Sequence, residues 1–414
     1  MSPFLRRLLS LLLVAVFFFF VFFELEHVPT HSDELLAEHE AVDQPSNDLE
    51  SSILLIGSNE KIVEKVSEKF CVVYNFTIAE GLSTTHPYEP ISLGLHSTMS
   101  YARYLVEQAD TWDDFISYAL FIEPRTEHFF YFVHRLWHCD ERVREKTSLH
   151  LVWELTPFQR ECTFDPEMLS FNGSCEGFYR RNAFPMMAAS VLVYPINYLR
   201  NIARRGAGTR LHIVADMENI FSGSFASMVR NETELMLRKH PEEKYVLVYR
   251  RFELVPGLRK PKDIPQLWTL LKGSRATFFH SKYFPLGHFI PGLHEWLRYS
   301  ADNTDVISIP VRYYSAGWEP QFIMVAEAPF HYEEVPTRRY DHQVLVRELC
   351  RADYSFRVLS HVFNIHVGWK TNHTHLEMVL HRVSKYDPHY GSPDFQQYLE
   401  RKYPETRGSC PRLR

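Results

Sequence analysis

Apolar stretches of strand length alternate along most of the chain with stretches that have the spacing of amphipathic helices. Strand-length runs fall at residues 71–77, 91–97, 116–122, 149–155, 211–218 and 244–254. Helical patterns fall between and after them, at residues 100–112, 127–139, 194–204, 232–240, 266–272 and 341–352. Strands that alternate with helices are typical of a sheet covered on both faces. The pattern therefore predicts an α/β fold with a mixed, mostly parallel sheet flanked by helices.

The last third of the chain has a less regular pattern. Residues 278–297 are rich in histidine and aromatic side chains and predict an irregular segment. Apolar runs flank the tripeptide WEP at residues 318–320. Residues 355–370 predict two short strands that end near His366.

The N-terminal region has the pattern of a membrane anchor. Two arginines precede an apolar run at residues 8–23, and acidic residues follow it. This charge order predicts a signal-anchor helix with residues 1–7 in the cytosol and the rest of the chain in the lumen. Residues 24–50 are acidic and lack Phe, Tyr and Trp, which predicts a flexible stem before a folded domain at 51–414. A cleaved signal peptide, and hence a secreted lectin, is the alternative.

Charge and cysteine content narrow the class of protein further. A net charge of −6 argues against nucleic acid as a partner. The six cysteines form an even set that is compatible with disulfides in a lumenal protein. Cys162 and Cys175 would close a short loop and are the preferred pair.

Candidate chemistry lies where the run at residues 211–218 ends. Asp216 and Glu218 stand two positions apart there. Ligands of such sheets bind beyond the carboxyl ends of the strands. Two carboxylates so placed could hold one Mn²⁺ or Mg²⁺, which would in turn bind a diphosphate. The pair therefore predicts a metal site for a nucleotide-sugar donor.

Several blocks of sequence, in a fixed order, resemble one family of enzymes. These are ISLGLHSTMSYARYLVEQADTWDDFISYALFI, YPINYLRNIAR with the acidic pair after it, GHFIPGLHEW, WEPQFIM and SFRVLSHVFNIHVGWK. Together they resemble glycosyltransferase family 49 over roughly residues 91–403. That family holds β-1,4-glucuronyltransferase and the glucuronyltransferase half of the LARGE-type enzymes.

The resemblance implies a Golgi type II membrane enzyme with a GT-A-like nucleotide-sugar fold. It implies Mn²⁺ (or Mg²⁺) as cofactor, UDP-glucuronate as donor, a glycan acceptor and inversion at the anomeric carbon. The family's two acids match Asp216 and Glu218, and its third metal ligand matches His366. Asn197 and Arg200 match the helix that packs beside the donor. A homodimer or a complex with a partner transferase is left open.

The sequence departs from the family pattern at two places, and these departures allow a different donor or a loss of activity. The second acid is Glu218 instead of aspartate, and Arg338 and Arg339 stand where a glycine is expected. A glycine lost beside a pyrophosphate could block close approach of the backbone. The alternatives are therefore a donor such as UDP-N-acetylglucosamine, or a catalytically silent relative that binds glycans.

An inverting transfer also needs a base that deprotonates the acceptor hydroxyl. The resemblance points first to Glu333 as this base, with Glu334 and Glu319 as the other candidates. Glu319 could instead hydrogen-bond a sugar hydroxyl while Trp318 stacks on the sugar ring.

Further polar residues are candidates for binding the substrates. Arg200 and Lys370 could pair with the diphosphate or with the carboxylate of the donor. His280, His288 and Trp296 could form a cluster on the acceptor side, although without the resemblance they are better explained as aromatic core and surface residues.

Overall fold

The computed structural model describes residues 63–67, 69–123, 127–156, 158–163, 173–176, 194–384 and 393–411. All of them belong to one compact unit, Asn59–Arg414. The predicted cytosolic tail, anchor and stem lie outside the described residues. Within the described part of the chain, no helix is both long enough and apolar enough to cross a membrane.

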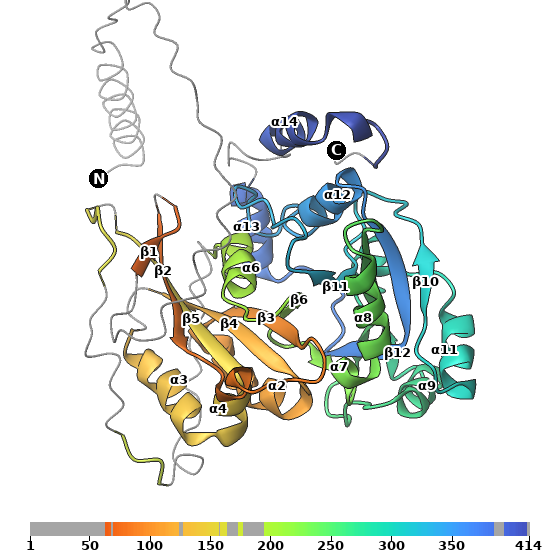
Figure 1. The fold of residues 1–414 in the computed structure, drawn as a ribbon, viewed down its shortest axis with the longest axis horizontal. Helices are drawn as coiled ribbons and strands as arrows, with labels where there is room; N and C mark the ends of the chain where they lie inside the picture. The colour runs from red at the N-terminus through yellow and green to blue at the C-terminus, as the bar shows by residue number, and fades with distance from the viewer. Residues whose placement is uncertain are drawn as a thin grey trace, which may run out of the picture. The chain divides into compact units, whose positions relative to one another are not determined.

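The described strands and helices follow the predicted alternation closely (Figure 1). The strands are β1 (Val63–Lys65), β2 (Phe70–Thr77), β3 (Ile91–Thr98), β4 (Phe115–Ile122), β5 (Thr147–Glu154), β6 (Leu211–Asp216), β7 (Ile220–Phe221), β8 (Tyr245–Leu254), β9 (Ala276–Phe278), β10 (Ser308–Val311), β11 (Gln321–Val325) and β12 (Ser355–Val367). The helices are α2 (Leu105–Thr111), α3 (Glu127–Cys139), α4 (Glu141–Lys146), α6 (Ile196–Arg205), α7 (Phe225–Met228), α8 (Arg230–Lys239), α9 (Ile264–Lys272), α10 (Pro285–His288), α11 (Leu293–Asp302), α12 (Gln343–Arg351), α13 (His375–Ser384) and α14 (Pro393–Lys402).

The strands form one mixed sheet in the order β1-β2-β5-β4-β3-β6-β11-β8-β12-β10, with β7 beside β12 and β9 beside β8. The prediction of an α/β fold with a mixed sheet is confirmed. The prediction that the sheet is mostly parallel holds only for the longest pairings. Parallel pairing joins β5, β4, β3 and β6, and joins β8 to β12, whereas every other described pairing is antiparallel. A short apolar run such as that of β11 has the same composition whichever way it points, so the sequence did not show the reversal.

Strand β4 illustrates how the helices cover both faces of the sheet. Tyr118 and Leu120 point into the core formed with α2, α3 and α4. The alternate residues Ala119 and Phe121 pack against the apolar side of α6. Figure 1 shows α3 and α4 on one side of these strands and α6 on the other. The two-residue period of the strand thus separates two layers of helices.

Helix α6 is held on the sheet by a helical stripe of Leu199, Ile202 and Ala203, all of them fully buried. The spacing of these residues is that of a helix with one apolar face. Because the polar side chains of α6 come from its other faces, this packing decides where Asn197 and Arg200 lie.

The end of α6 makes a close contact with His150 of β5. A Cβ added at Gly206 would lie 2.2 Å from Cε1 of the buried His150 ring. That ring cannot move freely, because its Nδ1 accepts from the backbone N–H of Asn75 and its Nε2 lies 2.8 Å from the hydroxyl of Ser117.

We therefore expect Gly206→Ala to lower the free energy of unfolding by about 1–3 kcal/mol, as overpacking does in other cores. Chemical denaturation of the two proteins measures the difference. Gly208→Ala is the matched control, because its Cβ would meet only Leu82 at 3.4 Å. Equal stabilities of the two variants would contradict the steric argument.

Disulfide bonds join Cys71 to Cys162, Cys139 to Cys175 and Cys350 to Cys410. The prediction of disulfides is confirmed, but the preferred pairing of Cys162 with Cys175 is wrong. Loop length alone suggested that pair. The fold instead brings Cys162 to strand β2 and Cys175 to the end of α3.

Two predictions for the last third of the chain also need correction. Residues 355–370 contain one strand, β12, whose register against β8 shifts between Val358 and Phe363. His361 has a left-handed backbone (φ 66°) at this irregularity, so the strand is interrupted locally but continues in the same sheet. The segment predicted as irregular contains α11, whose buried Trp296 and Leu297 face the core.

Candidate active site

Strands β6, β11 and β8 bring three charged side chains to one edge of the sheet. Asp216 is the last residue of β6, and Arg251 lies near the end of β8. Strand β11 runs antiparallel between β6 and β8, so its beginning lies beside both strand ends. Glu319 precedes β11 by two residues. The register therefore gathers Asp216, Arg251 and Glu319.

Asp216 is surrounded by basic groups. Nη2 of Arg251 lies 3.7 Å from its Oδ2, while Nη2 of Arg200 and Nε2 of His96 lie 4.0 Å and 3.8 Å from its Oδ1. Burial acts to raise the pKa of Asp216, but the charges of Arg200 and Arg251 outweigh it and lower this pKa to about 2. Asp216 is therefore ionised at neutral pH.

Glu218 follows in the turn after β6 and behaves differently. Burial, and then the negative charge of Asp216, raise its pKa to about 7. Two carboxylates that repel each other in this way are suited to share a divalent cation, because the cation would relieve the repulsion. The chemistry of this pair fits the metal predicted from the sequence.

His366 lies in the same neighbourhood, on strand β12. The His366 ring packs edge-on against the ring of Phe279, with 5.5 Å between the centroids. Cζ of Arg251 lies 3.8 Å from the centroid of the Phe279 ring. Burial, and then the charge of Arg251, lower the pKa of His366, so its imidazole is neutral and able to bind a metal. Nevertheless, no three His, Cys, Asp or Glu side chains within the described residues lie close enough together to hold a metal ion.

Helix α6 contributes Arg200 and Asn197 to the site. Nη1 of Arg200 donates to Oδ1 of Asn197 at 3.1 Å and to Oδ1 of Asp341 at 3.3 Å. Nδ2 of Asn197 donates to the carbonyl of Tyr332 at 2.8 Å. The buried charge of Arg200 is thus shared between Asp216 and Asp341, and Asn197 holds the guanidinium in place.

Lys370 and Arg338 meet at another carboxylate. Nζ of Lys370 and Nη1 of Arg338 donate to the same oxygen of Glu377, at 2.6 Å and 2.7 Å. Burial opposes the ionisation of Glu377, but the hydrogen bond from Lys370 and the other donors outweigh it and lower the pKa of Glu377 to about 2. Lys370 is therefore paired with α13 and not with Asp216.

Among the three candidate bases, Glu333 and Glu334 are paired with helix α6. Oε1 of Glu333 accepts from Nδ2 of Asn201 at 2.7 Å and from Nη1 of Arg205 at 3.1 Å. Oε1 of Glu334 accepts from the hydroxyl of Tyr198 at 2.9 Å. These contacts hold both carboxylates beside α6 and not beside Asp216.

Glu319 is the candidate base that shares the neighbourhood of Asp216. Its Oε1 accepts from Nε2 of Gln343, and its Oε2 lies 3.6 Å from Nε2 of His288. The side chain is a quarter exposed, while the preceding Trp318 is fully buried and fixes the backbone. Burial, and then the charge of Asp341, raise the pKa of Glu319 to about 8.

The predicted cluster of His280, His288 and Trp296 is divided by the structure. The rings of His280 and His288 lie 5.0 Å apart, near Glu319. Trp296 instead packs against Arg250, 5.4 Å from its guanidinium, and donates its N–H to the carbonyl of Leu359. Only the two histidines thus border the site.

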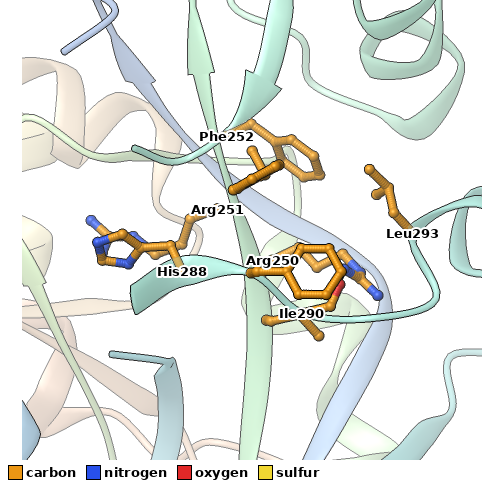
Figure 2. A pocket seen from close by; sticks show the side chains of 8 residues that line it. Arg250, Arg251, Phe252, His288, Ile290 and Leu293 are labelled. Atoms are coloured by element: carbon orange, nitrogen blue, oxygen red, sulfur yellow. The ribbon is translucent and has the colours of Figure 1, made fainter. Parts of the chain in front are cut away.

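Sequence reasoning missed Arg251. The signal was present, because strand β8 (YVLVYRRFEL) carries two adjacent arginines within a largely apolar run. Neighbouring strand residues point to opposite faces. Figure 2 shows Arg251 on the same side as His288, and Arg250 directed the other way, toward Ile290. A cavity of about 20 Å³ lies among these residues.

Acids and buried arginines at the strand ends of a mixed sheet are typical of an α/β enzyme that binds an anionic ligand. The sequence profile of glycosyltransferase family 49, described as "glycosyl-transferase for dystroglycan", matches residues 90–404. The chain belongs to this family, and it is a glycosyltransferase. The resemblance noted in the sequence is confirmed.

The relatives that match this chain are distant from it in sequence. β-1,4-Glucuronyltransferase 1 of Danio rerio is 22% identical over 335 residues, which cover 77% of this chain and 75% of the relative. The Homo sapiens protein of the same name is 22% identical over 80% of each chain. Xylosyl- and glucuronyltransferase LARGE2 of Rattus norvegicus is 25% identical over 42% of this chain and 24% of the relative.

A solved structure of S. aureus TarS in complex with UDP has a remote likeness to this fold. The TM-score is 0.33 at 10% sequence identity, and the match covers 77% of this chain and 72% of that one.

Proposed function

We propose that the chain is an inverting, metal-dependent glycosyltransferase that moves glucuronic acid from UDP-glucuronate to a saccharide acceptor. The observation that carries this proposal is the pair Asp216 and Glu218 at a strand end, with Arg200 and Arg251 beside it. The family and the relatives named as glucuronyltransferases support the choice of sugar.

The proposal includes a location in the Golgi membrane, with residues 8–23 as the anchor and the folded unit in the lumen. The three disulfides support it, because such bonds persist in the oxidising secretory pathway and are rare in the cytosol.

Asp216 and Glu218 are the carboxylates that would hold the cation. His366, the third ligand that the resemblance implies, would have to move toward them, because no three described His, Cys, Asp or Glu side chains lie close enough together to hold a metal ion. Such a cation supplies positive charge that stabilises the departing diphosphate. Arg200 and Arg251 keep Asp216 ionised, as a ligand must be.

Glu319 is the base in this proposal. Gln343 and His288 orient its two carboxylate oxygens. The carboxylate accepts the proton of the acceptor hydroxyl while the hydroxyl oxygen bonds to the anomeric carbon and UDP departs with the electron pair of the broken bond. A pKa of about 8 makes Glu319 a stronger base than an ordinary carboxylate.

Thermal unfolding of the full-length protein tests the proposal. UDP at a hundred times its Kd should stabilise the protein by about 2.7 kcal/mol, and hence raise Tm by several degrees, only when Mn²⁺ is present. Addition of EDTA should abolish the shift, and uridine without phosphates should not produce it. A shift that is independent of metal would refute the metal site, and no shift with UDP would refute the proposed UDP-sugar donor.

A catalytically silent relative is the second candidate, and one observation favours it. Arg200 and Arg251 already neutralise Asp216, as a structural ion pair would. If the arginines replace the cation, Mn²⁺ should not change the effect of UDP on Tm, and the same assay therefore separates the two functions.

A further inference from the structure

Arg251 is a buried cation whose hydrogen-bonding capacity is largely unused. The residue is 8% exposed, and its Nε and Nη2 have no hydrogen-bond partner within the described part of the chain. Its distance of 3.7 Å to Asp216 is that of an ion pair and is too long for a hydrogen bond. Unused donors on a buried charge cost free energy unless a ligand or a water accepts from them, so two such donors on one guanidinium favour a ligand site.

Other buried arginines in this fold are used differently. Arg250 donates to the backbone carbonyls of Ile290 and Pro291, at 2.7 Å and 2.5 Å. Arg204 likewise donates to the carbonyls of Ala328 and Pro329. These two arginines hold loops in place, whereas Arg251 makes no such bond to the described backbone. Its guanidinium instead lies over the ring of Phe279, with 3.8 Å between Cζ and the ring centroid.

The position of Arg251 indicates which part of a donor it would meet. It is paired with Asp216, where the diphosphate would be held. On its other side the ring of Phe279 also packs against His288, with 4.8 Å between centroids, and His288 lies 3.6 Å from Glu319. In a single displacement the donor sugar lies between the diphosphate and the base, so Arg251 borders the sugar.

We infer that Arg251 binds the carboxylate of a hexuronic acid donor and thereby selects such a donor over neutral sugars. The inference rests on the proposed function, since it takes the places of diphosphate and base from it. A planar guanidinium can bind a carboxylate through two parallel hydrogen bonds, which its free Nε and Nη2 edge would supply. On the sugar itself, the carboxylate at C6 is the group that carries negative charge.

Isothermal titration of the full-length protein in Mn²⁺ tests the inference with UDP-glucuronate, UDP-glucose and UDP as probes. UDP-glucose is the matched ligand, because it lacks only the carboxylate. We expect the wild type to bind UDP-glucuronate on the order of 10-fold more tightly than UDP-glucose. Arg251→Gln should weaken UDP-glucuronate binding about 10-fold to 100-fold further than it weakens the binding of UDP-glucose and UDP, which also depends on the ionised Asp216. Arg251→Lys should have an intermediate effect.

Arg250→Gln is the control on the same strand. It should lower Tm and leave the ratio of the two donor affinities at its wild-type value, because Arg250 points to the other face.

Several results would overturn the inference. An equal loss for all three probes in Arg251→Gln would assign Arg251 to the diphosphate, and no loss would make it a structural partner of Asp216. If Arg251→Gln does not fold, the wild type alone still tests the inference. Equal affinity of the wild type for UDP-glucuronate and UDP-glucose would overturn it. A wild type that binds none of the probes refutes the proposed function itself, which is a separate outcome.

Discussion

Replacing Glu319 by Gln should lower kcat by about 10²-fold to 10⁴-fold, the usual contribution of a general base. The amide keeps the shape and can still contact Gln343, but it cannot take a proton. Binding of UDP should not change, because the proposed base acts on the acceptor hydroxyl and not on the diphosphate. Turnover assays with UDP-glucuronate and a saccharide acceptor, beside titration with UDP, measure both effects.

Glu333→Gln and Glu334→Gln are the matched controls, because these carboxylates are bound to Asn201, Arg205 and Tyr198 of α6. Both variants should keep kcat near the wild-type value. Loss of turnover in Glu333→Gln with full activity in Glu319→Gln would return the role of base to Glu333, as the resemblance suggests.

The raised pKa of Glu319 also predicts a pH dependence of the same reaction. A base works in its ionised form, so kcat/KM should rise as the pH increases through about 8 and level off above it. The residual activity of Glu319→Gln should lack this rise.

The strand–helix alternation and the acidic pair were predictable from sequence because they depend on local spacing. The stripe Leu199, Ile202 and Ala203 places α6 on the sheet without reference to distant residues. Asp216 stands at a strand end for the same reason.

Features that depend on contacts between distant segments could not be predicted. The pairing of Cys71 with Cys162 joins residues 91 positions apart, which loop length alone would not select. Glu319 reaches the site because antiparallel β11 lies between β6 and β8, and this reversal leaves no mark in a short apolar run. Arg251 was visible as a charge in an apolar strand, but only the register shows that it faces Asp216.

Replacing Asp216 by Asn should remove the metal-dependent effect of UDP on Tm and lower turnover on the order of 10³-fold, because stabilisation of the diphosphate by a cation is worth several kcal/mol. The variant also leaves Arg200 and Arg251 without the carboxylate between them. Asp216 is 37% exposed, and solvent therefore screens part of this loss. The variant should consequently fold, with a lower Tm than the wild type.

Glu218 provides the comparison that separates a metal ligand from a structural charge. Glu218→Asp keeps a carboxylate and should retain metal-dependent stabilisation by UDP, whereas Glu218→Gln should lose it. Glu218→Gln should also raise the stability of the metal-free protein at pH 8, because it removes the repulsion from Asp216 that raises the pKa of Glu218. If Glu218 is a metal ligand, Glu218→Gln should therefore lose UDP binding and also be more stable than the wild type without metal. Removal of a purely structural ion pair would not produce both results. Wild-type UDP binding in Glu218→Gln would exclude Glu218 from the site and would favour the silent relative, in which Arg200 and Arg251 take the place of the cation.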